Sequence, residues 1–309
     1  MTNVGSDGAP FEARSRAPAS SRRESCAPEL VTRRVVLDGR TVALDVHPGD
    51  GVPVVLLHGI PGWRGTWSRV AARLAANHPV LVPDLLGFGE SDAPPEEHFH
   101  AKEHADVILR LLDALGVEQA HLVGHDFGGP TALLLARRAP ERVRTLALLA
   151  TNTFVDTPIP FPLGIARVPI LGALFFRVAF GRWGLLAAWR AATRDRVAFP
   201  LERYRRMLAF AAGVTWTRKI FYRSLRELPR LYADVQSSIE ALAVPSAVLW
   251  GDSDPFFPRS VAERTAAAAR ATLHILPGCG HFVPEERPDA VAAHLEELFA
   301  RAPGMRDFS

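Results

Sequence analysis

Short apolar segments alternate with amphipathic segments along most of the chain. Apolar runs typical of buried strands occur at Val54–Leu57, Val80–Val82, Leu122–Val123, Thr145–Leu149, Ala247–Leu249 and Thr272–Leu276. Helical spacing of apolar residues occurs between or after them, at Trp67–Ala76, Ala101–Leu115, Pro130–Arg138, Arg259–Ala269 and Pro288–Arg301. Upstream, residues 35–46 are typical of a hairpin that turns at Asp38 and Gly39. The alternation predicts an α/β fold in which helices cover both faces of a mostly parallel central sheet.

The alternation breaks once, between about residues 151 and 243, where helical pieces are separated by Pro and Gly. From Asp156 to Glu240 there are fourteen Lys and Arg against six Asp and Glu, although the whole chain carries a formal charge of only +3. An inserted helical cap between the sixth and seventh strands accounts for both observations. We therefore expect a tail over residues 1–30, a core domain over residues 31–150 and 244–305, and a cap over residues 151–243.

The most apolar part of the predicted cap runs from Ile159 to Trp189, and its only charged residues are Arg167, Arg177 and Arg182. Three interpretations stay open at this point. The segment packs onto the core domain, it forms an apolar entrance for substrate, or it rests on a membrane surface.

Composition narrows the class of protein. With 48% hydrophobic and 22% charged residues the chain is typical of a globular protein, and its small net charge indicates no nucleic-acid partner. Two cysteines, Cys26 and Cys279, form no disulfide framework, so a reducing, cytoplasmic compartment is expected. The first 29 residues lack the apolar segment of a secretory signal and are expected to be disordered. No run of about 18 uncharged apolar residues occurs, so stable membrane insertion is not expected.

The candidate nucleophile lies in the sequence Gly124-His-Asp-Phe-Gly128, between an apolar run and a helix-forming run. This is the spacing of a nucleophile elbow, in which a strand turns sharply into a helix, with Asp126 where serine usually stands. Small residues on both sides allow the backbone to bend this tightly. The turn also places the side chain at a helix N-terminus, where backbone N–H groups favour an anion. Asp126 is therefore the predicted nucleophile.

The strand Val54–Leu57 is followed directly by the sequence His58-Gly-Ile-Pro61. A loop in this position can aim a backbone N–H at the same point as the N–H of the residue after the nucleophile. Ile60 and Phe127 are therefore the predicted oxyanion-hole donors. Trp67 is expected to pack this loop down.

Two loops downstream supply a candidate acid and a candidate base. The strand that ends near Trp250 is followed by Asp252 and Asp254. We favour Asp254, because prolines follow it closely and fix its loop, and we expect Asp252 to bind N–H groups of a turn. His281 lies in a glycine-rich loop after the last strand. The order nucleophile, acid, histidine is that of the α/β-hydrolases.

The other histidines suggest no metal site. His98, His100 and His104 cluster near a helix start, but no cysteine or compact set of carboxylates accompanies them, so we expect a solvated stretch and no bound metal. His58 and His125 flank the reactive centre and are expected to be structural.

These motifs together resemble the α/β-hydrolase fold of the epoxide hydrolase and haloalkane dehalogenase branch, from about residue 35 to the end. The resemblance implies an enzyme that needs no cofactor. The run Phe221-Tyr222-Arg223 is similar to a run in the late cap of epoxide hydrolases, although the second cap Tyr or His that they usually carry is absent around Leu171. Dehalogenases of this branch usually have Trp and Asn where this chain has Phe127 and Ile60, neither of which offers a side-chain donor to a halide.

An aspartate at the elbow predicts substitution at carbon. A carboxylate that attacks an ester would give a labile anhydride, whereas attack on an sp³ carbon gives a stable alkyl ester. His281, oriented by Asp254, then activates water to hydrolyse the ester of Asp126. The favoured function is epoxide hydrolysis, with hydrolytic dehalogenation as the alternative. A ligand-binding relative with little turnover is a remoter alternative, and Asp126 argues against a serine-type esterase.

The leaving group should be met by a side chain of the cap. An epoxide oxygen needs an acid, and all three tyrosines of the chain, Tyr204, Tyr222 and Tyr232, fall in the cap. Tyr222 is the first choice because of its local motif, and Tyr232 and then Tyr204 follow as substrate-binding residues. Trp183 or Trp189 could instead donate to a halide. The expected partner is a small apolar organic substrate, and a homodimer is left open.

Overall fold

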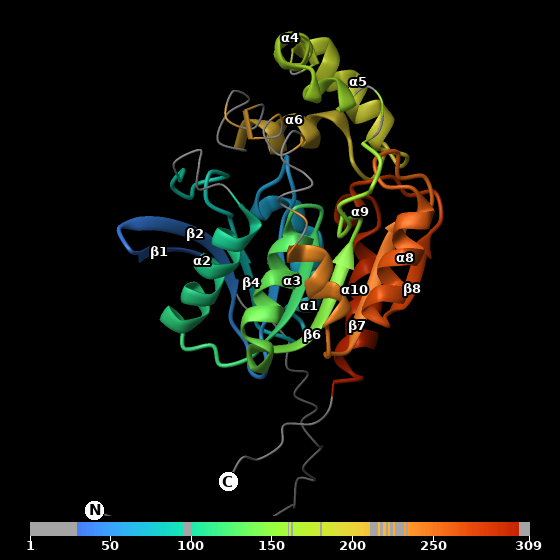
Figure 1. The fold of residues 1–309 in the computed structure, drawn as a ribbon. Helices are drawn as coiled ribbons and strands as arrows, with labels where there is room; N and C mark the ends of the chain where they lie inside the picture. The colour runs from blue at the N-terminus through green and yellow to red at the C-terminus, as the bar shows by residue number, and fades with distance from the viewer. Residues whose placement is uncertain are drawn as a thin grey trace, which may run out of the picture.

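A central sheet of eight strands organises the described part of the molecule (Figure 1). The computed structural model describes residues 30–94, 100–159, 161, 163–179, 181–210, 216, 219, 220, 222, 225, 232 and 234–302. The strands are β1 (Val31–Leu37), β2 (Arg40–His47), β3 (Val54–Leu57), β4 (Val80–Pro83), β5 (Ala120–His125), β6 (Val143–Leu149), β7 (Ser246–Gly251) and β8 (Thr272–Leu276). Their order across the sheet is β1-β2-β4-β3-β5-β6-β7-β8. The pairs β1–β2 and β2–β4 are antiparallel, and all other neighbours are parallel.

Helices of the core lie on both faces of this sheet. They are α1 (Ser68–Leu74), α2 (Ala101–Ala114), α3 (Gly128–Arg138), α8 (Arg259–Ala269), α9 (Val283–Glu286) and α10 (Pro288–Phe299), with short 3-10 turns at Arg64–Trp67 and Pro140–Arg142. Val55 and Leu57 of β3 belong to a hydrophobic cluster with α2, α3 and α8. Val54 and Leu56 belong to a second cluster with α1 and α10. Since side chains alternate along a strand, β3 must be apolar throughout to fill both clusters, which explains its continuous apolar sequence.

Three described helices lie between β6 and β7, where the sequence predicts the cap. They are α4 (Pro169–Ala179), α5 (Arg182–Ala192) and α6 (Leu201–Phe210), preceded by a 3-10 turn at Leu163–Arg167. Figure 1 shows them stacked beyond one end of the sheet, with α4 farthest from the strands. The underside of the cap packs on the core through a cluster that joins Phe199, Tyr204 and Met207 to Phe282. The Arg203 guanidinium reinforces this contact, because it pairs with the buried Glu285 carboxylate of the core.

The strand and helix positions predicted from periodicity are confirmed with small shifts. The hairpin turns at Asp38 and Gly39, both with positive φ, and β3 and β8 have the predicted bounds. Helix α3 begins two residues earlier than predicted, at Gly128, because the elbow leads directly into it. Among the described residues no single helix is long and apolar enough to cross a membrane. Helices α4 and α5 reach that length and composition only as a pair that bends by 83°.

One histidine predicted to be solvated is buried. His104 of α2 is 2% exposed and lies edge-on to the Phe127 ring, with 5.4 Å between ring centroids. Burial, followed by the nearby His58 and His100, lowers the pKa of His104 to about 3. The prediction failed because histidine is both polar and aromatic, and its position in α2 follows the buried face of the helix. His98 lies outside the described residues.

Acid should therefore destabilise the fold through His104. Between an unfolded pKa of about 6.5 and the folded pKa of about 3, the unfolded chain binds a proton that the folded chain excludes, so stability falls as pH drops. From about pH 7.5 to pH 5 this effect amounts to about 2 kcal/mol. The His104→Leu variant has no such ionisation. Its free energy of unfolding, measured with urea, should therefore fall by about 2 kcal/mol less over this pH range than that of the unaltered chain. Equal losses of unfolding free energy in the variant and the unaltered chain would contradict the lowered pKa of His104.

Candidate active site

Four loops converge at the carboxyl edge of the parallel strands. They follow β3, β5, β7 and β8 and carry Ile60, Asp126, Asp254 and His281. Because β3 pairs with β5, and β6, β7 and β8 follow in order, these loops lie along one continuous edge. The carboxyl ends of parallel strands are the usual place for ligand sites in α/β folds. The sheet topology thus brings together residues that are far apart in sequence.

Asp126 occupies the sharp turn between β5 and α3. Its backbone has φ 51°, in the left-handed region that non-glycine residues rarely adopt. The Asp126 N–H donates to the Leu149 carbonyl at 3.0 Å, and the Thr151 hydroxyl donates to the Asp126 carbonyl at 2.6 Å. Gly128 allows the close approach that the turn needs, since a Cβ there would lie 2.3 Å from the Leu57 carbonyl oxygen. The side chain of Asp126 is therefore held clear of the sheet.

Two backbone donors act on the Asp126 carboxyl. The Ile60 N–H donates to Oδ1 at 2.7 Å, and the Phe127 N–H hydrogen-bonds the same carboxyl. Burial raises the pKa of Asp126, and this effect outweighs the opposing effects of His281 and of the two N–H groups. The two donors predicted for an oxyanion hole thus meet at one carboxyl group, from opposite loops.

His281 lies between the two aspartates. Its Nε2 is 3.7 Å from Asp126 Oδ2, and its Nδ1 is 3.0 Å from Asp254 Oδ2. Asp254 is held in turn by the Phe256 and Phe257 N–H groups, which donate to its Oδ1 at 2.8 and 3.2 Å. The structure therefore brings together the predicted nucleophile, base and acid with the geometry of a catalytic triad.

The charge of His281 depends on these neighbours. Burial alone would lower the pKa of His281, but the Asp254 carboxylate, the hydrogen bond to it and the Asp126 carboxylate together raise the pKa above its usual value. A raised pKa favours a histidine that takes up a proton during the reaction, as a general base must.

Asp252 lies in the adjacent turn and has a different set of contacts. Its Oδ2 accepts the Gly278 N–H at 2.9 Å, and its Oδ1 accepts the Cys279 N–H at 3.3 Å. These bonds confirm the prediction that Asp252 binds N–H groups of a turn. Cys279 itself is buried, as a small core residue would be.

The loop of His281 is fixed to the cap as well as to the core. The His281 N–H donates to the carbonyl of Ala192, the last residue of α5, at 2.8 Å. On the core side, His125 Nε2 is 3.0 Å from the His281 carbonyl oxygen. This contact fits the structural role expected for His125, whose pKa is lowered by burial to about 3, so that the ring is neutral and donates from Nε2.

Glu286, which was not predicted from the sequence, strengthens the connection between the His281 loop and the cap. Its carboxylate is buried, and Oε2 accepts the N–H groups of Gly280 at 3.1 Å and of Arg194 and Asp195 at 2.8 Å each. The first donor belongs to the loop of His281 and the other two to the link between α5 and α6. The only signal in the sequence is an acidic residue shortly after the candidate base, which is too common to be informative.

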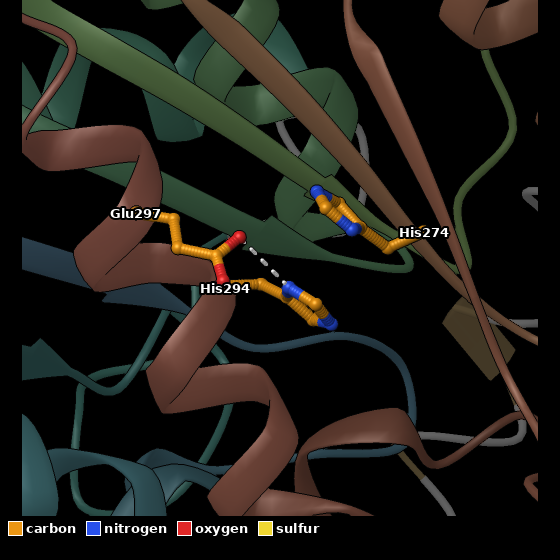
Figure 2. A group of neighbouring side chains, drawn as sticks. All are labelled: His274, His294 and Glu297. Carbon is orange, nitrogen blue, oxygen red and sulfur yellow. Dashed lines mark hydrogen bonds and ion pairs between the residues drawn. The ribbon is translucent and has the colours of Figure 1, made fainter.

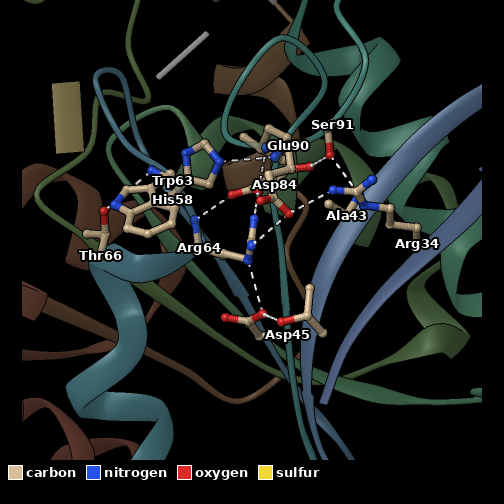
Figure 3. A network of polar contacts seen from close by, with 12 residues as sticks. Arg34, Ala43, Asp45, His58, Trp63, Arg64, Thr66, Asp84, Glu90 and Ser91 are labelled. Atoms are coloured by element: carbon tan, nitrogen blue, oxygen red, sulfur yellow. Dashed lines mark hydrogen bonds and ion pairs between the residues drawn. The ribbon is translucent and has the colours of Figure 1, made fainter. Parts of the chain in front are cut away.

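A second polar network lies behind the oxyanion loop (Figure 3). Asp84, the residue directly after β4, accepts the Arg64 N–H at 2.7 Å and forms an ion pair with the Arg64 guanidinium. His58 Nε2 accepts the Leu85 N–H at 3.0 Å, so its proton lies on Nδ1, 2.9 Å from the Gly59 carbonyl oxygen. This pattern confirms a structural role for His58 and fixes the loop that ends at Ile60.

The three cap tyrosines differ in their surroundings. The pKa of Tyr232 is raised by burial and by the charge of Asp126, and Tyr232 packs against the hydrophobic cluster that contains Ile60 and Phe127. Tyr222 packs instead in a separate small cluster with Leu225. Tyr204 is buried beneath the cap against Phe282, in the cluster that joins cap and core.

The contacts of Tyr222 change the order of preference among the tyrosines. The sequence motif favoured Tyr222, whereas the charge of Asp126 contributes to the raised pKa of Tyr232. The role of Tyr222 stays a prediction from its motif. Phe221 and Arg223 lie outside the described residues.

Neither cap tryptophan is placed to hold a halide. Trp183, predicted as a substrate-binding residue, is 73% exposed, which argues against a place in a closed substrate site. The Trp189 indole N–H donates to the Phe199 carbonyl at 3.1 Å and is therefore already used. Both residues are in the predicted cap, but helix packing turns Trp183 to the surface and Trp189 to the underside of the cap.

A further cluster of possible metal ligands lies at the sheet edge, formed by His274 of β8 and His294 and Glu297 of α10 (Figure 2). The His294 Nδ1 is 3.2 Å from a Glu297 carboxylate oxygen. The two imidazoles are stacked, with 3.9 Å between centroids and 27° between planes. Lone pairs of nearly parallel rings do not converge on one point, so this arrangement does not fit a preformed metal centre.

Comparison with known proteins agrees with the fold. Residues 52–288 match the family model described as alpha/beta hydrolase fold, so the chain belongs to the alpha/beta hydrolase fold family. It is 31% identical to a cis-3-alkyl-4-alkyloxetan-2-one decarboxylase of Shewanella oneidensis, over 82% of this chain and 83% of that protein. It is 28% identical to haloalkane dehalogenase 2 of Mycobacterium tuberculosis, over 82% and 90%. The solved structure of the epoxide hydrolase CorEH superposes with a TM-score of 0.69 at 23% identity, over 88% and 99%.

The two neighbouring acids allow a matched test of the triad. Asp254→Asn removes the charge and the acceptor that orient His281, so turnover should fall on the order of 10²–10⁴-fold while the fold persists. Asp252→Asn keeps one acceptor oxygen for the turn and should change turnover little. Steady-state kinetics and circular dichroism of both variants provide the measurement. The opposite ranking would reassign the acid to Asp252.

Proposed function

We propose that this chain is an enzyme that opens a strained, oxygen-containing ring by attack of the Asp126 carboxylate on an sp³ carbon, and that its substrate is an epoxide. The observation that carries the proposal is the arrangement at the elbow, where a carboxylate stands in the nucleophile position 3.7 Å from His281 Nε2. Within the alpha/beta hydrolase family, this residue type is suited to alkyl transfer and not to acyl transfer.

The reaction has two steps. An Asp126 oxygen forms a bond to a ring carbon, the C–O bond of the epoxide breaks, and the released alkoxide takes up a proton. His281 then removes a proton from water, which attacks the ester carbonyl of Asp126 and releases a vicinal diol. The Ile60 and Phe127 N–H groups, which contact the carboxyl in the resting structure, stabilise the oxyanion of the second step.

Tyr232 is the proposed proton donor in the first step. Tyr232 packs against the cluster that contains Ile60 and Phe127, and its hydroxyl lies under the electrostatic influence of Asp126. A phenol in this position can donate to the alkoxide as the ring opens. Ile60, Phe127, Tyr232 and Phe257 belong to or pack against one hydrophobic cluster, which favours a small apolar substrate.

Dehalogenation has less support. A leaving halide needs hydrogen-bond donors, and Ile60 and Phe127 offer none from their side chains. The Trp189 N–H is bound to a backbone carbonyl, and Trp183 is at the surface. The similarity to a haloalkane dehalogenase is compatible with a shared alkyl-enzyme step and a different leaving group.

An oxetan-2-one is the second candidate substrate, favoured by the 31% identity to a decarboxylase named for that ring. Attack of Asp126 on the sp³ carbon that bears the ring oxygen would break the C–O bond and release a carboxylate, which needs no proton. Loss of carbon dioxide would then form a C=C bond and expel the Asp126 carboxylate, without consumption of water. This route makes the proton donor and the hydrolytic role of His281 dispensable.

Tyrosine variants distinguish an epoxide substrate from an oxetan-2-one substrate. With an epoxide, Tyr232→Phe should slow alkylation of Asp126 by roughly 10²–10⁴-fold, because the alkoxide loses its acid. Tyr222→Phe is the matched control and should leave this step nearly unchanged. Single-turnover kinetics on an epoxide, an oxetan-2-one and a haloalkane, with identification of diol, alkene or alcohol, provide the measurement. Alkene formation from the oxetan-2-one by both variants at the wild-type rate, with no diol from any epoxide, would reject the epoxide assignment.

A further inference from the structure

The cap carries an apolar surface that no described part of the chain covers. On α4 the side chains of Ile170, Leu174 and Val178 recur every four residues and are 87%, 58% and 67% exposed. Residues four apart lie on one face of a helix, so these three form a single stripe, and Leu171 widens it.

The polarity of α4 is the reverse of that of an ordinary surface helix. Gly172, Phe175 and Ala179 face inward, since they are buried or half-buried, whereas the large aliphatic side chains face outward. A helix that packs on a water-soluble core normally turns its charged residues to the solvent. Here the only charged residue of α4 is Arg177, which is exposed beside the apolar stripe. The outward face of α4 therefore requires an apolar partner.

Exposed apolar side chains also flank α4 on both sides in the sequence. Phe161 and Val168 precede the helix and are 88% and 50% exposed, and Trp183 at the start of α5 is 73% exposed. We call these side chains, together with those of the stripe, the α4 face. Figure 1 shows α4 at the end of the molecule that lies farthest from the sheet, where nothing of the described chain lies beyond it.

The charges around the α4 face limit what can cover it. From Leu163 to Ala192 the sequence contains four arginines and no Lys, Asp or Glu. Two copies of this face would bring like charges together, which argues against a symmetric dimer through it. A partner that is apolar inside and anionic at its surface satisfies both the exposed aliphatic side chains and the arginines. A segment that combines Trp, aliphatic residues and Arg has the composition of helices that lie in a membrane interface.

We propose that the α4 face rests on an anionic lipid bilayer, with α4 parallel to the membrane plane. Eleven residues of helix are about 16 Å long, and the bend of 83° to α5 prevents the pair from crossing a bilayer as one straight segment. The contact is thus peripheral, with Ile170, Leu174 and Val178 in the acyl boundary and Arg177 among the headgroups. It is independent of the reaction at Asp126.

Vesicle flotation of the full chain tests the proposal. Binding to vesicles of phosphatidylcholine and phosphatidylglycerol in equal parts should exceed binding to phosphatidylcholine alone, and salt should weaken it. The double variant Ile170→Gln/Leu174→Gln should bind about tenfold more weakly or worse, because two aliphatic side chains no longer enter the bilayer. Val36→Gln is the matched control, since Val36 is 68% exposed but lies on β1, and it should bind like the unaltered chain.

A second readout locates the contact. Brominated lipids should quench the fluorescence of Trp183, and the quenched fraction should disappear in Trp183→Phe. Absence of vesicle binding, or equal binding by the double variant, would overturn the proposal. A dimer of the full chain that becomes a monomer in the double variant would assign the α4 face to a second copy and would equally overturn it.

Discussion

The close backbone contact between the loop after β3 and the turn after β5 is the constraint on which the site depends. β3 and β5 are paired neighbours, with Leu57 opposite Gly124, so their loops leave the sheet side by side. A Cβ on Gly59 would lie 2.4 Å from the Cβ of Asp126, which leaves room for glycine alone. Because the loops approach this closely, the Ile60 N–H reaches the Asp126 carboxyl at 2.7 Å. The proposed nucleophile and its proposed oxyanion donors are thus parts of one backbone arrangement.

The position of His281 depends on the cap. His281 donates its N–H to the last residue of α5, and the buried Glu286 carboxylate joins its loop to the link between α5 and α6. A shift of the cap would therefore also move the base relative to Asp126. Burial raises the pKa of Glu286, and this effect outweighs the opposing effect of the three N–H donors. The cap in this structure both covers the elbow and positions the histidine.

The sequence was informative where one local signal determines the structure. β3 and β8 could be predicted because continuous apolar runs need burial on both sides, and Asp126, Asp254 and His281 because each follows a strand that ends at the same edge. The cap was less predictable. Which side of a helix faces the core depends on contacts between segments far apart in sequence, so the sequence predicted neither the 73% exposure of Trp183 nor the influence of Asp126 on Tyr232. Glu286 and His104 were missed because their roles arise from burial, which a single polar residue does not reveal.

The most direct measurement of the central claim is the mass of the His281→Gln variant after addition of an epoxide in single-turnover conditions. Loss of the base should leave attack by Asp126 intact and block hydrolysis of the ester, so the protein should gain the mass of one substrate molecule. The added mass should map to the peptide that holds Asp126 and should be absent when Asp126 is also replaced by Ala. Full turnover by Asp126→Ala alone, with no adduct on His281→Gln, would contradict a covalent reaction at Asp126.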